Sequence, residues 1–257
     1  MLAEYQKRRL YFAVGGITVT LNFAHRGFSG QFPENTMLAF EKAVEAGADG
    51  IELDVQFSKD GELVIMHDET LNRTAGVDGF VKDYTLEQLK AMDVSGKWVD
   101  RYGSMEIPTL REYFEHFKDL PVITNIELKT GIFPYPGIEE RTLEMIREYE
   151  LENKIIISSF NHYSCLKMKE LDEKMPCGLL EESWIVGAGK YGRKLGMDFL
   201  HPAYPMVTES YVQDAADHGL KVNTWTVNDW DSMEYFAKIG VNAIIGNFPD
   251  LAEKALN

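Results

Sequence analysis

Two carboxylates and a histidine stand at or near the ends of apolar runs in the segment IELDVQFSKDGELVIMHD, residues 51–68. Residues i and i+2 of a β-strand point to the same face of the sheet, so Glu52 and Asp54 share one face. His67 follows the next apolar run, with Asp68 beside it. Apolar side chains would pack better at buried strand positions, so these polar residues indicate a site that carries out chemistry.

A similar arrangement recurs on other expected strands. Glu127 and Lys129 alternate in NIELK, and His25 ends the apolar run of NFAHRG. We expect these residues to meet Glu52 and Asp54 where parallel strands run out into their loops. Three carboxylates in one place repel one another unless positive charge lies among them. A hard divalent cation, Mg²⁺ or Ca²⁺, suits oxygen ligands of this kind.

The other histidines and one tryptophan have ordinary structural interpretations as well. His116, His162 and His218 fall in or beside helical stretches and are expected to be structural. His201, in DFLHP, ends a strand and is compatible with either a structural or a functional role. Trp225, in VNTWTVN, ends the seventh expected barrel strand, where it would lie either in the core or in a wall that faces substrate.

Apolar or β-branched runs alternate with amphipathic stretches along most of the chain. Asn35 or Thr36 and Thr208 are candidate N-caps, and several of the expected helices end in glycine. About eight βα units in about 240 residues favour a (β/α)₈ TIM barrel over an open doubly wound sheet. No G-x-G-x-x-G or P-loop sequence occurs, which argues against a Rossmann fold. The expected strands lie at residues 21–24, 50–55, 63–66, 121–128, 154–158, 177–180, 198–201, 221–226 and 243–246.

One region interrupts this alternation. Residues 68–120 are too long for a single link between a strand and its helix. They contain turn-forming residues, a short expected helix near 85–91 and a longer one near 109–117. We expect the first part, about residues 68–107, to form a small inserted subdomain over the barrel mouth.

The ends of the barrel domain follow from the same pattern. Residues 1–18 are expected to be an N-terminal extension and residues 19–257 a single barrel domain. A basic cluster before an apolar stretch also gives the extension some likeness to a secretory signal, without a convincing cleavage site. The two cysteines, Cys165 and Cys177, form no CxxC pair and favour reduced thiols in a cytoplasmic protein.

Composition excludes several classes of protein. Hydrophobic residues make up 45% of the 257, enough for a packed core. The formal net charge of −15 argues against a general nucleic-acid binder and against adsorption to an anionic membrane. No apolar window of about 18 residues occurs, so no stable membrane insertion is expected. An anionic substrate would need a local source of positive charge, which a bound metal ion can supply.

Several segments together resemble the glycerophosphodiester phosphodiesterase family, of the bacterial cytosolic type. The resemblance covers the chain from about residue 20 to its end, including the insertion. It implies a TIM barrel that uses a divalent metal to hydrolyse small-molecule sn-glycerol-3-phosphodiesters to glycerol 3-phosphate and an alcohol. The segments are HRGFSGQFPENT (25–36), GIELDVQFSKDGELVIMHD (50–68), IPTL (107–110), IELK (126–129), NTWTVN (223–228) and IIGNFPDL (244–251).

Matched position by position, the resemblance also implies roles for individual residues. The closing segment departs from the family pattern at Gly246, where a threonine is usual, and we expect no effect on the chemistry. The attacking group is either the glycerol 2-hydroxyl of the substrate, by way of a cyclic phosphate, or water, and the sequence leaves both open. The implied metal ligands are Glu52, Asp54 and Glu127, the implied acid–base pair is His25 and His67, and the implied phosphate ligands are Arg26 and Lys129.

Other functions stay open at this point. A glycosidase would use paired carboxylates on a barrel, but it leaves two histidines and Arg26 unexplained. A non-catalytic phosphodiester-binding barrel typically lacks a ligand or a catalytic histidine, and here all are present. Lysophospholipase-D-like and phosphoinositide-type phospholipase C activities are alternatives within the class. For the first, Phe80, Trp98 and Tyr102 of the insertion would form either an acyl-chain wall or the insertion's own small core. The preferred alcohol, the choice between the two ions and the oligomeric state are left open.

Overall fold

Eight parallel strands of the computed structural model, which describes residues 19–257, close into a barrel. The order around the barrel is β1, β9, β8, β7, β6, β5, β4 and β2, and β2 pairs with β1 to close it. The expected TIM barrel is therefore confirmed, whereas the extension expected at residues 1–18 lies outside the described residues. The strands are β1 Leu21–His25, β2 Gly50–Phe57, β4 Ile123–Leu128, β5 Ile155–Ser159, β6 Cys177–Glu181, β7 Phe199–Pro202, β8 Lys221–Trp225 and β9 Ala243–Gly246.

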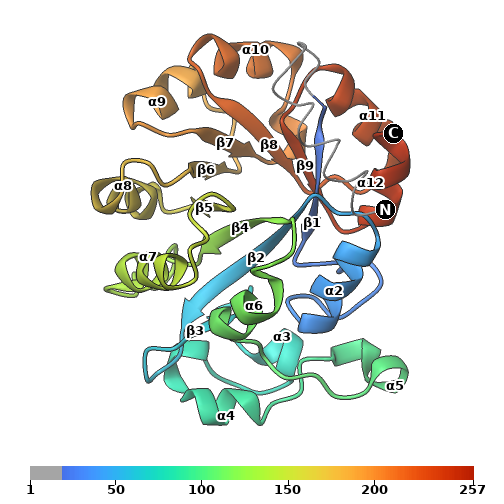
Figure 1. The fold of residues 1–257 in the computed structure, drawn as a ribbon, viewed down its shortest axis with the longest axis vertical. Helices are drawn as coiled ribbons and strands as arrows, with labels where there is room; N and C mark the ends of the chain where they lie inside the picture. Colours follow the sequence, from blue (N-terminus) through green and yellow to red (C-terminus); the bar gives the residue numbers. More distant parts are fainter. Residues whose placement is uncertain (1–18) are drawn as a thin grey trace.

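A helix follows each barrel strand and packs outside the sheet (Figure 1). The N-caps expected at Thr36 and Thr208 are confirmed, since each hydroxyl accepts a backbone N–H three residues on, at 3.2 Å. None of the helices in the described part of the chain combines the length and apolar character that crossing a bilayer requires. The helices are α2 Met37–Glu45, α6 Leu110–Phe117, α7 Ile138–Glu148, α8 His162–Leu171, α9 Ala188–Lys194, α10 Glu209–Asp217, α11 Trp230–Lys238 and α12 Pro249–Ala255, with a 3₁₀ turn η3 at Tyr204–Met206.

Side chains of the strands alternate between the barrel interior and the helix layer. Phe23, Ile156 and Ile245 pack together inside the barrel. Gly50 faces the same interior, because a Cβ atom there would lie 2.6 Å from the ring of Phe23. With a period of two, the inward face of β2 then continues through Glu52 toward the end of the strand. The alternation seen in the sequence therefore directs the carboxylates of β2 into the mouth of the barrel.

The insertion between β2 and α6 has a small apolar core of its own. It begins with β3, Leu63–Ile65, which pairs antiparallel with β2. The expectation that the run at 63–66 is a barrel strand is therefore wrong, since the chain folds back as a hairpin there. The remaining elements of the insertion group along one side of the barrel (Figure 1) and are α3 Asn72–Ala75, η1 Val81–Asp83, α4 Leu86–Lys90, η2 Gly96–Trp98 and α5 Val99–Tyr102. The buried core residues are Val64, Met66, Leu71, Val81, Leu89, Val94 and Ile107.

Three aromatic residues of the insertion, Phe80, Trp98 and Tyr102, are not among the buried residues of that core. Phe80 packs edge-to-face on Phe133, in the loop after β4, at a ring distance of 5.2 Å. Tyr102 stacks on Phe32, in the loop after β1, at 5.0 Å. Trp98 lies against Tyr102. These rings therefore join the insertion to the C-terminal end of the barrel.

Candidate active site

Three buried carboxylates converge at the C-terminal ends of neighbouring strands. Asp54 of β2 pairs in register with Glu127 of β4, and Glu52 precedes Asp54 on the same inward face. The side chains are 5%, 1% and 7% exposed for Glu52, Asp54 and Glu127. One oxygen from each lies within 4.8 Å of the others. The structure thus brings together the three residues that the sequence predicted to share one place.

The three carboxylates have different electrostatic environments. Burial and the neighbouring charges of Asp54 and Glu127 raise the pKa of Glu52 well above its usual value. Burial and Asp54 likewise raise the pKa of Glu127 to about 7. Burial opposes the ionisation of Asp54, but Arg26 outweighs it and lowers that pKa to about 2. Asp54 Oδ2 accepts from Asn35 Nδ2 at 2.9 Å, whereas Oδ1 is buried and accepts no hydrogen bond among the described residues. A buried acidic cluster with an unused oxygen is compatible with a divalent metal site.

Two cations border this cluster. Lys129 Nζ lies 2.9 Å from Glu127 Oε1 and 4.0 Å from Asp54 Oδ1. Arg26 Nε lies 3.5 Å from Asp54 Oδ2, and the Arg26 backbone N–H donates to Glu52 Oε2 at 3.0 Å. Burial opposes the charge of both cations, but the nearby carboxylates outweigh it and raise the pKa of Arg26 and of Lys129. Both side chains therefore stay positive at the mouth.

A tight turn after β1 directs Arg26 toward the cluster. Arg26 has a φ of 56° and Gly27 a φ of 76°, so two successive residues are left-handed. A Cβ atom at Gly27 would lie 2.7 Å from the backbone of Ala39 in α2, so only glycine fits. The His-Arg-Gly sequence therefore holds the arginine between the first strand and its helix.

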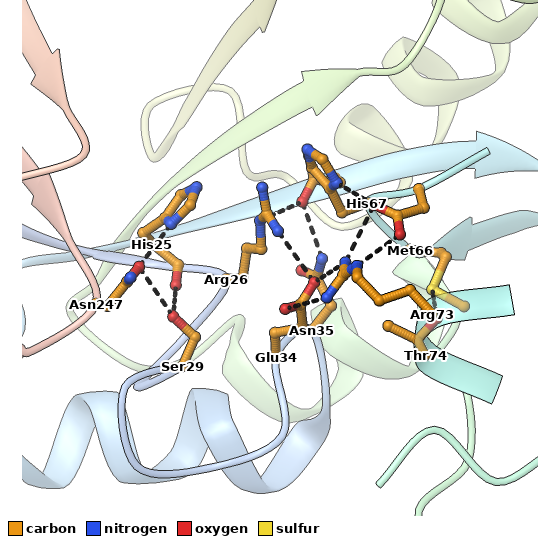
Figure 2. Close-up of polar contacts among 12 residues, drawn as sticks. His25, Arg26, Ser29, Glu34, Asn35, Met66, His67, Arg73, Thr74 and Asn247 are labelled. Atoms are coloured by element: carbon orange, nitrogen blue, oxygen red, sulfur yellow. Dashed lines mark hydrogen bonds and ion pairs between the residues drawn. The ribbon is translucent and has the colours of Figure 1, made fainter. Parts of the chain in front are cut away.

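His25, at the end of β1, is oriented by an amide. Its Nδ1 lies 2.7 Å from Asn247 Oδ1, and Ser29 Oγ lies 3.1 Å from the same oxygen (Figure 2). The amide oxygen can only accept, so Nδ1 carries the proton and Nε2 is left toward Glu52, whose Oε2 is 4.0 Å away. Burial and the neighbouring Arg26 lower the pKa of His25 to about 4.

The family departure at Gly246 has a steric explanation. A side chain at Gly246 would run into the backbone carbonyl of Val227, in the loop after β8. The backbone N–H of Asn247 donates to Asn228 Oδ1 at 2.8 Å, which fixes the following residue. The glycine therefore allows close packing between the two loops, and the contact from Asn247 to His25 is kept.

His67 reaches the mouth from the insertion. It lies two residues after β3, so the expectation that it ends a barrel strand is wrong. Its Nδ1 lies 2.7 Å from Asp68 Oδ1, which accepts the ring N–H. The buried Gln56 of β2 donates to the backbone carbonyls of Met66, His67 and Asp68 at 2.9, 3.3 and 2.8 Å. One amide therefore holds the whole segment that carries His67.

The two remaining candidates, Trp225 and His201, differ in their exposure. Trp225, at the end of β8, is partly buried, and its Nε1 donates to the carbonyl of His201 at 2.8 Å. Its ring meets the 40% exposed Phe160 edge-to-face at 5.5 Å. His201 is completely buried inside the barrel, where its Nε2 lies 3.0 Å from Asn223 Nδ2. His201 is therefore part of the interior.

Several residues that complete the site were not predicted from the sequence to take part in it. Gln56 continues the i, i+2 series of Glu52 and Asp54, so the same alternation would have pointed to it. Asn247 gave no such indication, because it contacts His25 only once β9 pairs with β1 as the barrel closes. The residues without an assigned role are Ser29, Glu34, Asn35, Gln56, Asp68, Arg73 and Asn247.

The mouth of this barrel places two cations and two imidazoles beside three buried carboxylates, at the rim where TIM-barrel enzymes have their active sites. Comparison with known proteins makes the class specific. The chain belongs to the glycerophosphoryl diester phosphodiesterase family, whose model matches residues 25–251. It is thus a phosphoric diester hydrolase, which argues against the glycosidase and the non-catalytic barrel.

The relatives cover nearly the whole chain. A glycerophosphodiester phosphodiesterase from Caldanaerobacter subterraneus subsp. tengcongensis is 45% identical over 231 residues, 90% of this chain and 95% of the relative. The crystal structure of a glycerophosphodiester phosphodiesterase from Thermotoga maritima is 30% identical, with a TM-score of 0.73 over 91% of this chain and 97% of that one. A phosphodiesterase from Oleispira antarctica, solved with the product sn-glycerol-3-phosphate, is 29% identical, with a TM-score of 0.84 over 93% and 97%.

Proposed function

We propose that the protein hydrolyses glycerophosphodiesters to sn-glycerol 3-phosphate and an alcohol. The observation that carries this proposal is the convergence of His25, His67 and three buried carboxylates at one barrel mouth. The Oleispira relative supports the substrate class, because it was solved with sn-glycerol-3-phosphate. Phosphodiester hydrolysis needs charge stabilisation at phosphorus and proton transfer at two oxygens, and the site has groups for both.

One divalent cation, Mg²⁺ or Ca²⁺, would be held by Glu52, Asp54 and Glu127. The unused Oδ1 of Asp54 and the raised pKa values of the other two carboxylates support this assignment, since a cation would relieve both. When bound, such an ion acts as a Lewis acid toward a phosphoryl oxygen and toward a hydroxyl group. Arg26 and Lys129 would hold the phosphate from the sides of the cluster, as persistent cations.

The two histidines would divide the proton transfers. His25, whose partner is a neutral amide and whose pKa is lowered to about 4, is neutral near pH 7 and suited to take the proton of the attacking hydroxyl at Nε2. His67 donates from Nδ1 to the Asp68 carboxylate, which orients the ring and leaves Nε2 for proton transfer, so we assign it protonation of the leaving alkoxide. The new P–O bond forms as the P–O bond to the alcohol breaks. Attack by water gives glycerol 3-phosphate directly, whereas attack by the substrate's own 2-hydroxyl gives a cyclic phosphate that water then opens. Trp225 would line the wall that the departing alcohol passes.

The experiment is release of glycerol 3-phosphate from glycerophosphocholine and glycerophosphoethanolamine. We expect EDTA to abolish release and Mg²⁺ or Ca²⁺ to restore it. His25→Ala and His67→Ala are each expected to lower kcat by roughly 10²–10⁴ with little loss of fold. With a p-nitrophenyl leaving group, which needs no acid, the defect of His67→Ala should shrink while that of His25→Ala persists. Near wild-type turnover in either variant on the natural substrate would refute the pair.

A second candidate is a lysophospholipase-D-like activity on lipid substrates. It is favoured by exposed rings on the loops around the mouth, namely Phe80, Phe160 and Trp184, which are 39%, 40% and 67% exposed. Such rings could contact an acyl chain that a small polar substrate lacks. Detergent-dispersed lysophosphatidylcholine should then compete with glycerophosphocholine, and Trp184→Ala should weaken that competition. Absence of competition would leave the small substrates as the better assignment.

We also propose a cytoplasmic location and a substrate that diffuses freely. Cys165 and Cys177 are free buried thiols, which is compatible with a reducing compartment. Cell fractionation followed by detection of the native protein would test the location. Recovery outside the cytoplasmic fraction would contradict it.

A further inference from the structure

One arginine of the insertion lies between two carboxylates from different parts of the chain. Arg73, on α3, donates from Nη1 and Nη2 to Glu34 Oε2 and Oε1 at 2.9 and 2.7 Å. It also donates from Nε and Nη2 to Asp68 Oδ2 and Oδ1 at 2.7 and 3.1 Å. Figure 2 shows its guanidinium between Glu34 and the segment that carries His67. Both carboxylates are thus fixed by planar, charge-assisted hydrogen bonds.

Each of these carboxylates in turn contacts a side chain of the mouth. Asp68 Oδ1 accepts the Nδ1–H of His67 at 2.7 Å. Glu34 Oε1 accepts from Arg26 Nη1 at 3.0 Å. The Arg73 guanidinium therefore contacts His67, the proposed acid, through Asp68. It contacts Arg26, a proposed phosphate ligand, through Glu34. Because Arg73 belongs to the insertion, the orientation of His67 and Arg26 also depends on how the insertion packs against the barrel.

We propose that Arg73 is a positioning residue for both groups. By holding the Asp68 carboxylate in one orientation, it keeps the His67 Nδ1–H hydrogen-bonded and so fixes the orientation of the ring, whose Nε2 carries the proton that is transferred. By holding Glu34, it keeps the Arg26 guanidinium directed toward the carboxylate cluster. This proposal rests on the proposed function, because the roles of His67 and Arg26 come from it.

If the role of Arg73 were purely structural, its removal would mainly lower the stability of the protein. The backbone around it is already held by the buried Leu71 and by the three hydrogen bonds from Gln56 to the carbonyls of residues 66–68. The Arg73 side chain is 49% exposed, so its truncation leaves no buried cavity. We therefore expect its removal to affect orientation much more than stability.

The first part of the experiment compares Arg73→Ala, Asp68→Asn and the double variant on glycerophosphocholine with a divalent metal present. Arg73→Ala should lower kcat by about 10–100-fold, through His67, and raise KM, through Arg26, with Tm changed by no more than about 3 °C. In the Asp68→Asn background the same change should have little further effect on kcat, because both act through one imidazole. Arg73→Lys, which cannot bridge both carboxylates, should rescue only in part. Arg101→Ala, at an exposed arginine of the same insertion, is the matched control.

The second part does not depend on turnover. In wild type, at a pH at which the His67 ring is neutral, ¹⁵N-histidine NMR should show its remaining proton at Nδ1, and Arg73→Ala should shift the neutral ring toward a mixture of tautomers. Unchanged kcat and KM in Arg73→Ala, or full multiplicative effects in the double variant, would overturn the proposal. So would an unchanged tautomer. Failure of wild type to hydrolyse any glycerophosphodiester would instead reject the proposed function, and the tautomer measurement would still decide the positioning role.

Discussion

Replacement of Glu52 by glutamine tests the assignment of the carboxylate cluster most directly. Burial and two neighbouring carboxylates raise the pKa of Glu52, so the charged form is disfavoured in the metal-free protein. Glutamine has nearly the same shape as the neutral acid, and its side-chain oxygen can still accept the backbone N–H of Arg26. The substitution therefore removes a proposed metal ligand and should leave the metal-free fold undisturbed.

The expected magnitudes follow from this difference. In EDTA the Tm of Glu52→Gln should lie within about 2 °C of wild type, because the charged form that glutamine cannot adopt is the disfavoured one. Metal at about 100 times its dissociation constant stabilises wild type by about 2.7 kcal/mol. For a domain of this length, about 2–4 °C per kcal/mol converts this to a rise of roughly 5–11 °C. The variant should lose most of that rise.

The assay is thermal unfolding followed by calorimetry or dye fluorescence, in EDTA and in a titration of Mg²⁺ or Ca²⁺. Glu170→Gln, at an exposed position of α8, is the matched control and should keep the full rise. A variant that keeps the wild-type rise would refute the role of Glu52 as a ligand. A variant strongly destabilised in EDTA would show instead that Glu52 is ionised and paired in the metal-free protein.

The remaining predictions concern pH and the groups that orient the site. Metal ligands must be ionised, and the raised pKa values of Glu52 and of Glu127, the latter about 7, mean that protons compete for them. Metal affinity should therefore fall as pH drops from 8 to 6, measured by titration calorimetry; a constant affinity would contradict the assignment. Asn247→Ala should lower kcat at least about 10-fold by freeing the His25 ring, while the metal-induced rise in Tm persists; unchanged turnover would argue against that orienting role. Gln56→Leu removes the donor to three backbone carbonyls and should lower the free energy of unfolding by about 1–3 kcal/mol, measured by urea denaturation. Wild-type stability in this variant would contradict the role of Gln56 in holding the segment.

The local repeat of the chain was enough to predict most of the fold. A period of two in the strands and about 3.6 in the helices is a property of neighbouring residues, so the eight βα units could be identified without tertiary information. The same alternation predicted that Glu52 and Asp54 share a face, and the register with β4 confirms that Glu127 joins them. The prediction at residues 63–66 was wrong because a short buried strand has the same sequence pattern whether it pairs parallel or antiparallel.

The residues that orient the side chains of the site could not be predicted from this local pattern. Asn247 is 222 residues from His25, and Arg73 is 39 residues from Glu34, so closure of the barrel and seating of the insertion alone bring them together. Amides and guanidinium groups are common at solvated positions, so their types give no indication of a partner.

The sequence by itself determined which chemistry is present and on which strands it is carried, because residue type and strand period are local properties. Only the tertiary structure decided how that chemistry is held. Burial shifts the pKa values of Glu52, Glu127 and His25, and the contact with Asn247, which follows the neighbouring strand β9, selects the tautomer of His25. Those effects depend on distances between residues far apart in the chain, which the folding of the barrel fixes.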